Sequence, residues 1–217
     1  MITISGDKIF ALTNRHFSYV FQATEEGVLH HLYYGEPLRD PTSVPVHHLR
    51  TQREATTNFE GVEHLNLSDL PQEYPTFGRS DFRAPAFHAR NSDGNSVFSF
   101  RYKSYRVTPG KPSCADLPSA RGGNSETLII TLEDHLYGVE VELFYTIYAE
   151  YGVLVRSAKI HNHGNEAVEL SHIFSSSLDL PADEYEIIIQ AEWSIEFRSQ
   201  TLLFQIMAKA YQKRLKI

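Results

Sequence analysis

The amino-acid sequence predicts an all-β protein in which antiparallel strands form two stacked sheets. Aromatic residues make up 12% of the 217 positions, with 13 Phe and 12 Tyr, and aromatic side chains pack well on a pleated surface. Apolar and polar residues alternate with a period of two along most segments, which is typical of strands that are buried on one face. Turn-forming residues separate consecutive segments, so neighbouring strands should pair as hairpins and bury one face against a second sheet.

The first three strands should form an antiparallel meander. Apolar-rich runs occupy Lys8–Leu12, Phe17–Gln22 and Val28–Tyr34. Turn-prone residues separate these runs, and Gly35 follows the third of them. From Glu36 to about Leu67 the periodicity disappears. A segment of this length without secondary structure is usually functional or mobile.

The remaining strands are expected in the second half of the chain. They are predicted over Ser96–Thr108, around Leu128–Leu132, and over Val139–Ile147, Val153–His161, Val168–Leu178 and Tyr185–Gln190. A strong turn signal at residues 161–166 predicts that the fourth and fifth of these strands form a hairpin. Tyr185–Gln190 is expected to be the last strand. From Thr201 to Ile217 the apolar residues follow helical spacing, which predicts a short C-terminal helix.

Composition and charge exclude several classes of protein. The net charge is −7, and no basic cluster occurs before the last few residues, so a nucleic-acid partner is not expected. No apolar run is long enough to span a bilayer. The N-terminal residues lack the pattern of a signal peptide, which predicts a cytoplasmic protein without a membrane partner. The single cysteine, Cys114, excludes an internal disulfide and is interpreted as an inert loop thiol.

One polar segment carries a specific resemblance. Residues 70–86 read LPQEYPTFGRSDFRAPA, and this stretch resembles the LPQEYP-x-x-G-x-x-D-F-R-x-P-A segment of the N-terminal domain of glycoside hydrolase family 36, which comprises mainly bacterial α-galactosidases. Further matching segments follow the same order and together cover roughly residues 8 to 196. They lie at residues 19–22, 31–35, 100–106, 110–112, 117–118, 126–134, 138–141 and 176–185.

The resemblance implies a fold and an activity. It implies an antiparallel β-supersandwich of the kind found in galactose mutarotases, here over residues 1–197, with residues 198–217 as a non-matching tail. In the family a (β/α)8 barrel follows and hydrolyses terminal α-D-galactosyl residues of melibiose or raffinose. Its retaining chemistry uses two carboxyl groups about 5–5.5 Å apart, which are aspartates on barrel strands. The chain is therefore expected to be truncated before the barrel, to hold no catalytic residue, to be inactive alone and to need no cofactor.

The resemblance also implies substrate-binding residues. Trp193 occupies the position of a tryptophan that contacts substrate in similar enzymes, and its indole could stack on a galactose ring. In bacterial relatives an Asp-Arg pair of the long loop reaches the active site of a neighbouring subunit in the tetramer. Here that pair is Gln52-Arg53, and a homo-oligomer is expected. Trp193 could instead be a buried core aromatic, and the loop a solvent-exposed linker. Two alternative functions are a free-standing carbohydrate-binding sandwich without catalysis and a structural oligomerisation domain.

The remaining candidate groups are interpreted as structural. Charged residues of the polar segment could touch sugar, but ion pairs that lock the loop are favoured because arginine forks match carboxylates; these residues are Glu73, Arg79, Asp81 and Arg83. Tyr74 and Phe77 are expected to anchor the same loop. The acidic pairs lie at strand ends or turns and are not expected to form a catalytic dyad; they are Glu133 with Asp134 and Asp183 with Asp179 or Glu184. The 11 histidines show no closed ligand set, so no metal is expected.

Overall fold

A computed structural model describes most of the chain. The described residues are 1–44, 62, 65–67, 70–79, 81, 83–113 and 123–178, together with the backbone of residues 184–193 and 196–205. The chain divides into two compact units, Met1–Leu178 and Asp179–Ile217. In the described residues the only helical element is a single 3-10 turn, η1, over Pro41–Ser43, and it is far too short to cross a membrane. The all-β prediction is confirmed.

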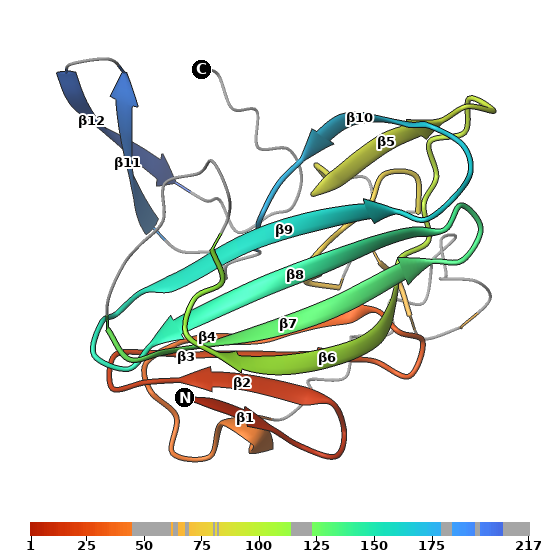
Figure 1. Ribbon diagram of the computed structural model, residues 1–217. Helices are drawn as coiled ribbons and strands as arrows, with labels where there is room; N and C mark the ends of the chain where they lie inside the picture. Colours follow the sequence, from red (N-terminus) through yellow and green to blue (C-terminus); the bar gives the residue numbers. More distant parts are fainter. Residues whose placement is uncertain are drawn as a thin grey trace. The chain divides into compact units, whose positions relative to one another are not determined.

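The first unit contains two four-stranded antiparallel sheets (Figure 1). One sheet has the order β1-β2-β3-β4, and the other has the order β6-β7-β8-β9. The strands of the first sheet are β1 (Ile2–Ile4), β2 (Ile9–Thr13), β3 (Ser18–Ala23) and β4 (Leu29–Gly35). Those of the second are β6 (Arg101–Pro109), β7 (Ser125–Asp134), β8 (Val139–Tyr148) and β9 (Leu154–Asn162). The predicted opening meander is confirmed in β2, β3 and β4.

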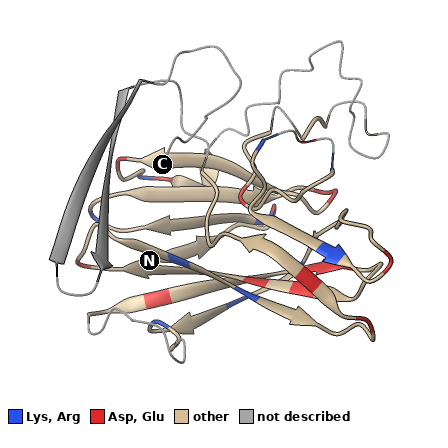
Figure 2. Cartoon of the chain, turned by 90° about the horizontal axis from the view of Figure 1, so that it is seen from above, with Lys and Arg blue, Asp and Glu red and all other residues tan. Residues whose placement is uncertain are grey.

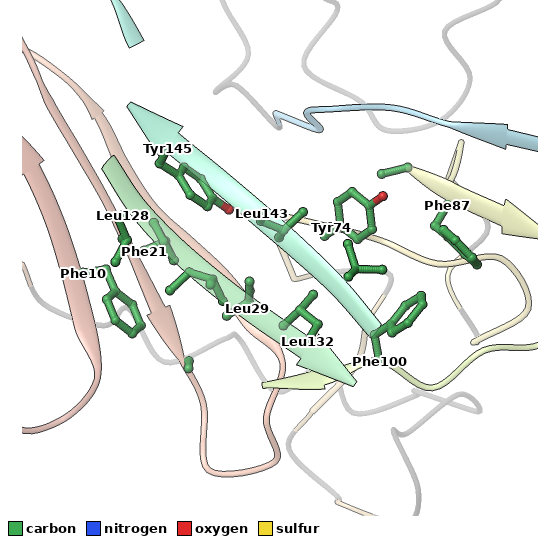
Figure 3. Packing of buried hydrophobic residues seen from close by; sticks show 14 of the residues in the cluster. Phe10, Phe21, Leu29, Tyr74, Phe87, Phe100, Leu128, Leu132, Leu143 and Tyr145 are labelled. Carbon is green, nitrogen blue, oxygen red and sulfur yellow. The ribbon is translucent and has the colours of Figure 1, made fainter. Parts of the chain in front are cut away.

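The two sheets share one hydrophobic core. Aromatic rings from both sheets meet there: Phe21 of β3 stacks on Tyr145 of β8 with 4.8 Å between ring centroids. Phe10 of β2 meets Tyr105 of β6 edge-on at 5.4 Å. Leu143, at the centre of β8, is fully buried (Figure 3). Burying each such side chain contributes about 1.5–3 kcal/mol, so the contact between the two sheets is the main stabilising interface of this unit.

A two-stranded ribbon extends the first unit. Strand β5 (Phe87–Asn91) pairs antiparallel with β10 (Val168–Ile173), and Figure 1 shows them side by side. The predicted hairpin between Val153–His161 and Val168–Leu178 is therefore wrong, because β9 pairs with β8 and β10 pairs with β5. A turn signal identifies where the chain reverses direction, but it does not identify the strand with which the following strand pairs. Here Ile173 packs into the core beside Phe87.

The second unit corrects two expectations about the C-terminal region. Strand β11 (Glu184–Trp193) pairs in continuous register with β12 (Glu196–Gln205), so Tyr185–Gln190 does not contain the last strand. The predicted helix over Thr201–Ile217 is wrong for residues 201–205, which belong to β12. Residues 206–217 lie outside the described part. Short apolar runs such as Leu202-Leu203 fit helical and strand patterns equally, and cross-strand pairing decides between them here.

Charges of both signs are distributed along the described strands. Figure 2 shows positions of Lys and Arg interspersed with those of Asp and Glu. Several pair with each other, as where Lys103 of β6 lies within 3.1 Å of Glu133 and 2.9 Å of Glu140. Basic positions on the described strands are thus mixed with acidic ones, unlike the basic face with which nucleic-acid-binding proteins contact a phosphate backbone.

Candidate functional site

The residues predicted to contact substrate are only partly placed by the structure. Trp193 is the last residue of β11 and pairs in register with Glu196 of β12, but its side chain lies outside the described part. Gln52 and Arg53 lie wholly outside the described residues, as does Cys114. Their roles stay predictions.

The polar segment lies against the first sheet, and Glu73 points into the interior. The backbone N–H of His31 donates to the carbonyl of Pro71 at 2.8 Å, and the N–H of Glu73 donates to the carbonyl of Leu29 at 3.1 Å. These bonds extend β4 by a short stretch of antiparallel pairing. As a result the side chain of Glu73 is fully buried.

Four side chains from both sheets converge on the carboxylate of Glu73. The hydroxyl of Tyr19 on β3 lies 2.7 and 2.8 Å from its two oxygens, and Nδ1 of His31 on β4 lies 2.7 Å from Oε1. From the other sheet, the hydroxyl of Tyr145 on β8 donates at 3.1 Å. A guanidinium nitrogen of Arg156 on β9 lies 3.1 Å from Oε2. We call these five residues the Glu73 cluster.

Electrostatics fix the charges of Glu73, Arg156 and the two tyrosines of the Glu73 cluster. Burial alone would raise the pKa of Glu73, but Arg156 and the hydrogen bonds from His31 and Tyr19 hold that pKa below its ordinary value of 4.5. Burial, reinforced by the nearby carboxylate, raises the pKa of Tyr19 and of Tyr145 well above 10.0. Burial would lower the pKa of Arg156, yet Tyr145 and Glu73 raise it. At neutral pH the cluster therefore holds one carboxylate, one guanidinium and two neutral phenols.

The Glu73 cluster is suited to stabilising the fold rather than to transferring protons. A general acid or base needs a pKa near the working pH and access to substrate, whereas Glu73 is a strengthened acid with no exposed surface. The expectation that ion pairs lock the loop is confirmed for Glu73, but its partner is Arg156 of β9 rather than an arginine of the same segment. Sequence reasoning missed this role of Arg156. Its only sequence signal is a charged residue within an otherwise apolar part of a strand.

A second group of contacts fixes the ends of the same segment. The carboxylate of Asp81 accepts hydrogen bonds from the guanidinium of Arg83 at 2.8–2.9 Å and from the amide of Gln72 at 2.7 Å. Arg83 also donates to the carbonyls of Leu67 and Leu70 at 2.8 and 2.7 Å. These contacts confirm a local ion pair, which ties Gln72 and the backbone at Leu67 and Leu70 to Asp81 and Arg83.

The remaining charge and anchor predictions have mixed outcomes. Tyr74 is buried in the core, as expected of an anchor. Phe77 is 43% exposed, and its ring contact within the described part of the chain is with the imidazole of His88, with 4.2 Å between ring centroids, so it does not anchor the loop in the core. Arg79 donates to the hydroxyl of Ser99.

The acidic pair that the structure describes has structural partners. Asp134 is buried and accepts backbone N–H groups from Ser99, Leu136 and Tyr137 at 2.5–3.0 Å. Its neighbour Glu133 pairs with Lys103. Among the described residues no group of three or more His, Cys, Asp or Glu side chains is arranged to hold a metal ion. Asp179, Asp183 and the side chain of Glu184 lie outside the described part.

A small cavity adjoins the polar segment. It has a volume of about 20 Å³ and is lined by residues that include Gln72, Tyr74, Thr76 and Leu132. A cavity of this size holds about one water molecule. It is too small for a sugar ring, so the segment does not form a substrate pocket at this point.

Comparisons with known proteins agree on one family. A sequence model described as "Glycosyl hydrolase family 36 N-terminal domain" matches residues 27–206. α-Galactosidase Mel36A of Lactobacillus acidophilus is 36% identical over 187 residues, which are 84% of this chain and 25% of the relative. α-Galactosidase AgaA of Geobacillus stearothermophilus is 37% identical over 194 residues, 87% of this chain and 26% of the relative.

Solved structures give the same result. The crystal structure of α-galactosidase AgaB from Geobacillus stearothermophilus aligns with a TM-score of 0.81 and 35% identity, covering 93% of this chain and 28% of that chain. A variant of AgaA in complex with raffinose aligns with a TM-score of 0.77 and 34% identity, covering 91% and 28%. The chain therefore spans about a quarter of the length of the relatives it matches.

Proposed function

Because the chain belongs to the N-terminal domain of glycosyl hydrolase family 36, we propose that it forms the N-terminal β-sandwich of an α-galactosidase. The enzyme hydrolyses terminal α-D-galactosyl residues of galactosides such as melibiose and raffinose. The observation that carries the proposal is the 36% identity with α-galactosidase Mel36A over 84% of this chain. The raffinose complex of the AgaA variant supports the choice of substrate class.

In this proposal the catalytic carboxylates lie outside the 217 residues. A retaining mechanism needs two carboxyl groups about 5–5.5 Å apart, one acting as nucleophile and one as acid and base. Three acidic residues of this chain have other roles: Glu73 is paired with Arg156, Glu133 with Lys103, and Asp134 caps a turn. These pairings favour a scaffold whose chemistry is supplied by another domain.

The sandwich contributes to the substrate pocket and to assembly. Trp193 stacks on the apolar face of a galactosyl ring, and Gln52 and Arg53 hydrogen-bond its hydroxyls from a neighbouring subunit of a homo-oligomer. The support for Trp193 is its position at the end of β11, where it pairs with Glu196 at the start of β12. Residues at strand ends are often used for binding because a rigid sheet positions them.

Two measurements on the 217-residue chain test this function. Incubation with nitrophenyl α-D-galactopyranoside should release no nitrophenol, and turnover by the chain alone would refute the placement of the catalytic groups. Titration with melibiose should change the fluorescence of Trp193, the only tryptophan, whereas maltose, which has no galactosyl unit, should not. A silent melibiose titration would remove Trp193 from the substrate site.

A further inference from the structure

The β5–β10 ribbon has one face in the core and one face outside it. Phe87 and Ala89 of β5 are fully buried, and Val168 and Ile173 of β10 pack against the same core. On β5 the side chain between Phe87 and Ala89 points the other way, because successive side chains of a strand alternate between faces, whereas on β10 a register shift between Leu170 and His172 interrupts this alternation. The ribbon is therefore anchored without help from its outer side chains.

Four aromatic rings line the outer face in an unbroken series. Phe77 of the polar segment stacks on His88 of β5 with centroids 4.2 Å apart and an interplanar angle of 25°. His88 meets His172 of β10 edge-on at 5.3 Å, and His172 meets Phe174 at 5.2 Å. We call these four residues the aromatic ladder. Its two end rings are open to solvent, since Phe77 is 43% and Phe174 is 51% exposed.

Unused polar groups lie within and beside the aromatic ladder. In the described part of the chain, neither His88 nor His172 has a hydrogen-bond partner for its ring nitrogens. The pair Ala89 opposite Leu170 comes next in the register, with Ala89 buried and Leu170 48% exposed, and Arg90 opposite Glu169 follows it, both exposed. Neither Arg90 nor Glu169 forms an ion pair with a described residue. Two imidazoles and two charged side chains thus lie on the same ribbon as the exposed rings.

The chemistry of this surface fits a neutral sugar. Exposed apolar patches usually mark binding sites, and small-molecule sites combine apolar and aromatic side chains with a few polar groups that orient the ligand. Here the centre of the ladder consists of two imidazoles. A pyranose presents C–H groups on its faces, which pack on aromatic rings, and hydroxyls around its rim, which need donors and acceptors.

We propose that the aromatic ladder is a binding platform for a neutral oligosaccharide. The end rings of Phe77 and Phe174 pack on sugar C–H groups, and the nitrogens of His88 and His172 exchange hydrogen bonds with hydroxyls. The site includes none of the residues assigned to substrate contact above and so goes beyond the proposed function. Only the choice of raffinose as the probe rests on that function.

Nuclear magnetic resonance of the histidine side chains tests the proposal directly. In the 217-residue chain, raffinose should shift the imidazole signals of His88 and His172 saturably, with a dissociation constant on the order of 1 mM. Phe77→Ala and Phe174→Ala should each weaken binding about three- to tenfold, because each removes one ring contact. Phe174→Leu should weaken it as well, since leucine keeps apolar area but has no ring face. Tyr151→Ala, which removes a 55% exposed ring from the β8–β9 turn, is the matched control and should bind as the parent chain does.

The outcomes separate this platform from the proposed substrate contact. Absent shifts, unchanged binding in both phenylalanine variants, or shifts that follow protein concentration without sugar would overturn it. The last result would identify the ladder as a self-association surface. Because the substitutions are at exposed positions, far-ultraviolet circular dichroism should show folded variants. Trp193 fluorescence is recorded in parallel, so a silent tryptophan with shifted histidines refutes only the substrate contact, and the reverse refutes only the platform.

Discussion

Substitution of Glu73 by glutamine should be among the most destabilising single changes in the first unit. The carboxylate accepts from Tyr19, His31, Tyr145 and Arg156, and it is fully buried. An amide has nearly the same shape but only one accepting oxygen, and its NH2 group would face these donors. The guanidinium of Arg156, which is 7% exposed at the side chain, would lose its counter-ion.

The size of the effect follows from that burial. Removing one partner of a buried ion pair costs about 3–5 kcal/mol, because the other charge stays desolvated without compensation. A domain of this size loses about 2–4 °C of melting temperature per kcal/mol, so Glu73→Gln should lower the melting temperature by roughly 6–20 °C. Glu142→Gln makes the same chemical change at a carboxylate whose partners Arg106 and His161 are 51% and 29% exposed at the side chain. That control should cost less than about 1 kcal/mol.

Urea unfolding followed by circular dichroism measures both variants. The double variant Glu73→Gln with Arg156→Met removes both charges, so it should cost clearly less than the sum of the two single changes. If Glu73→Gln and Glu142→Gln had the same unfolding free energy, the buried ion pair would not join the two sheets as argued. Strict additivity in the double variant would refute the pairing of Glu73 with Arg156.

Two further predictions concern pH and backbone strain. Burial lowers the pKa of His30 from 6.5 to about 4, so as pH falls the unfolded chain takes up this proton first. The free energy of unfolding should therefore fall between pH 6.5 and 4 by on the order of 3 kcal/mol, which urea titrations at several pH values measure. His30→Gln should remove this contribution to the pH dependence of stability. Gly78 has a φ of +84°, and an added Cβ would lie 2.7 Å from a methyl of Val97, whereas Gly94 has a φ of +85° and open space around it. Gly94→Ala should cost roughly 1–3 kcal/mol through backbone strain alone, and Gly78→Ala should cost more because its Cβ also clashes with Val97. Equal melting temperatures of the two variants in calorimetry would show that this clash has no effect.

The fold was predictable for most strands that pair with a sequence neighbour, although the hairpin of β11 and β12 was missed because the apolar residues of β12 also fit a helical period. Alternating residues and adjacent turns identified β2, β3, β4, β7 and β8, each of which pairs with a strand next to it in sequence. The same signals failed for β10, whose partner β5 lies more than seventy residues earlier. Short strands such as β1 carry too few residues to show a period. Long-range pairing depends on which core face a strand fills, and a single sequence does not state that.

The sequence allowed a prediction of which residue types form the candidate site, but not of which residues contact each other in it. The sequence singled out Glu73 as a charged residue of a locking segment, and the structure shows it buried and ion-paired. Its partners come from four strands spread over more than one hundred residues, namely those that carry Tyr19, His31, Tyr145 and Arg156. Only packing of the two sheets brings those groups within hydrogen-bond distance. No spacing rule along the chain contains that information.

The depth of the Glu73 cluster changes how substitutions in the polar segment should be interpreted. Glu73 and Arg83 lie in one family motif, yet Glu73 connects the two sheets and Arg83 holds irregular backbone at Leu67 and Leu70. In the α-galactosidase proposed above, either substitution would lower activity through loss of folded protein. A change in sugar affinity per folded molecule is the only result that would implicate either residue in sugar contact. For Glu73 no such change is expected, because a carboxylate with no exposed surface and four protein partners has no free acceptor for a hydroxyl group.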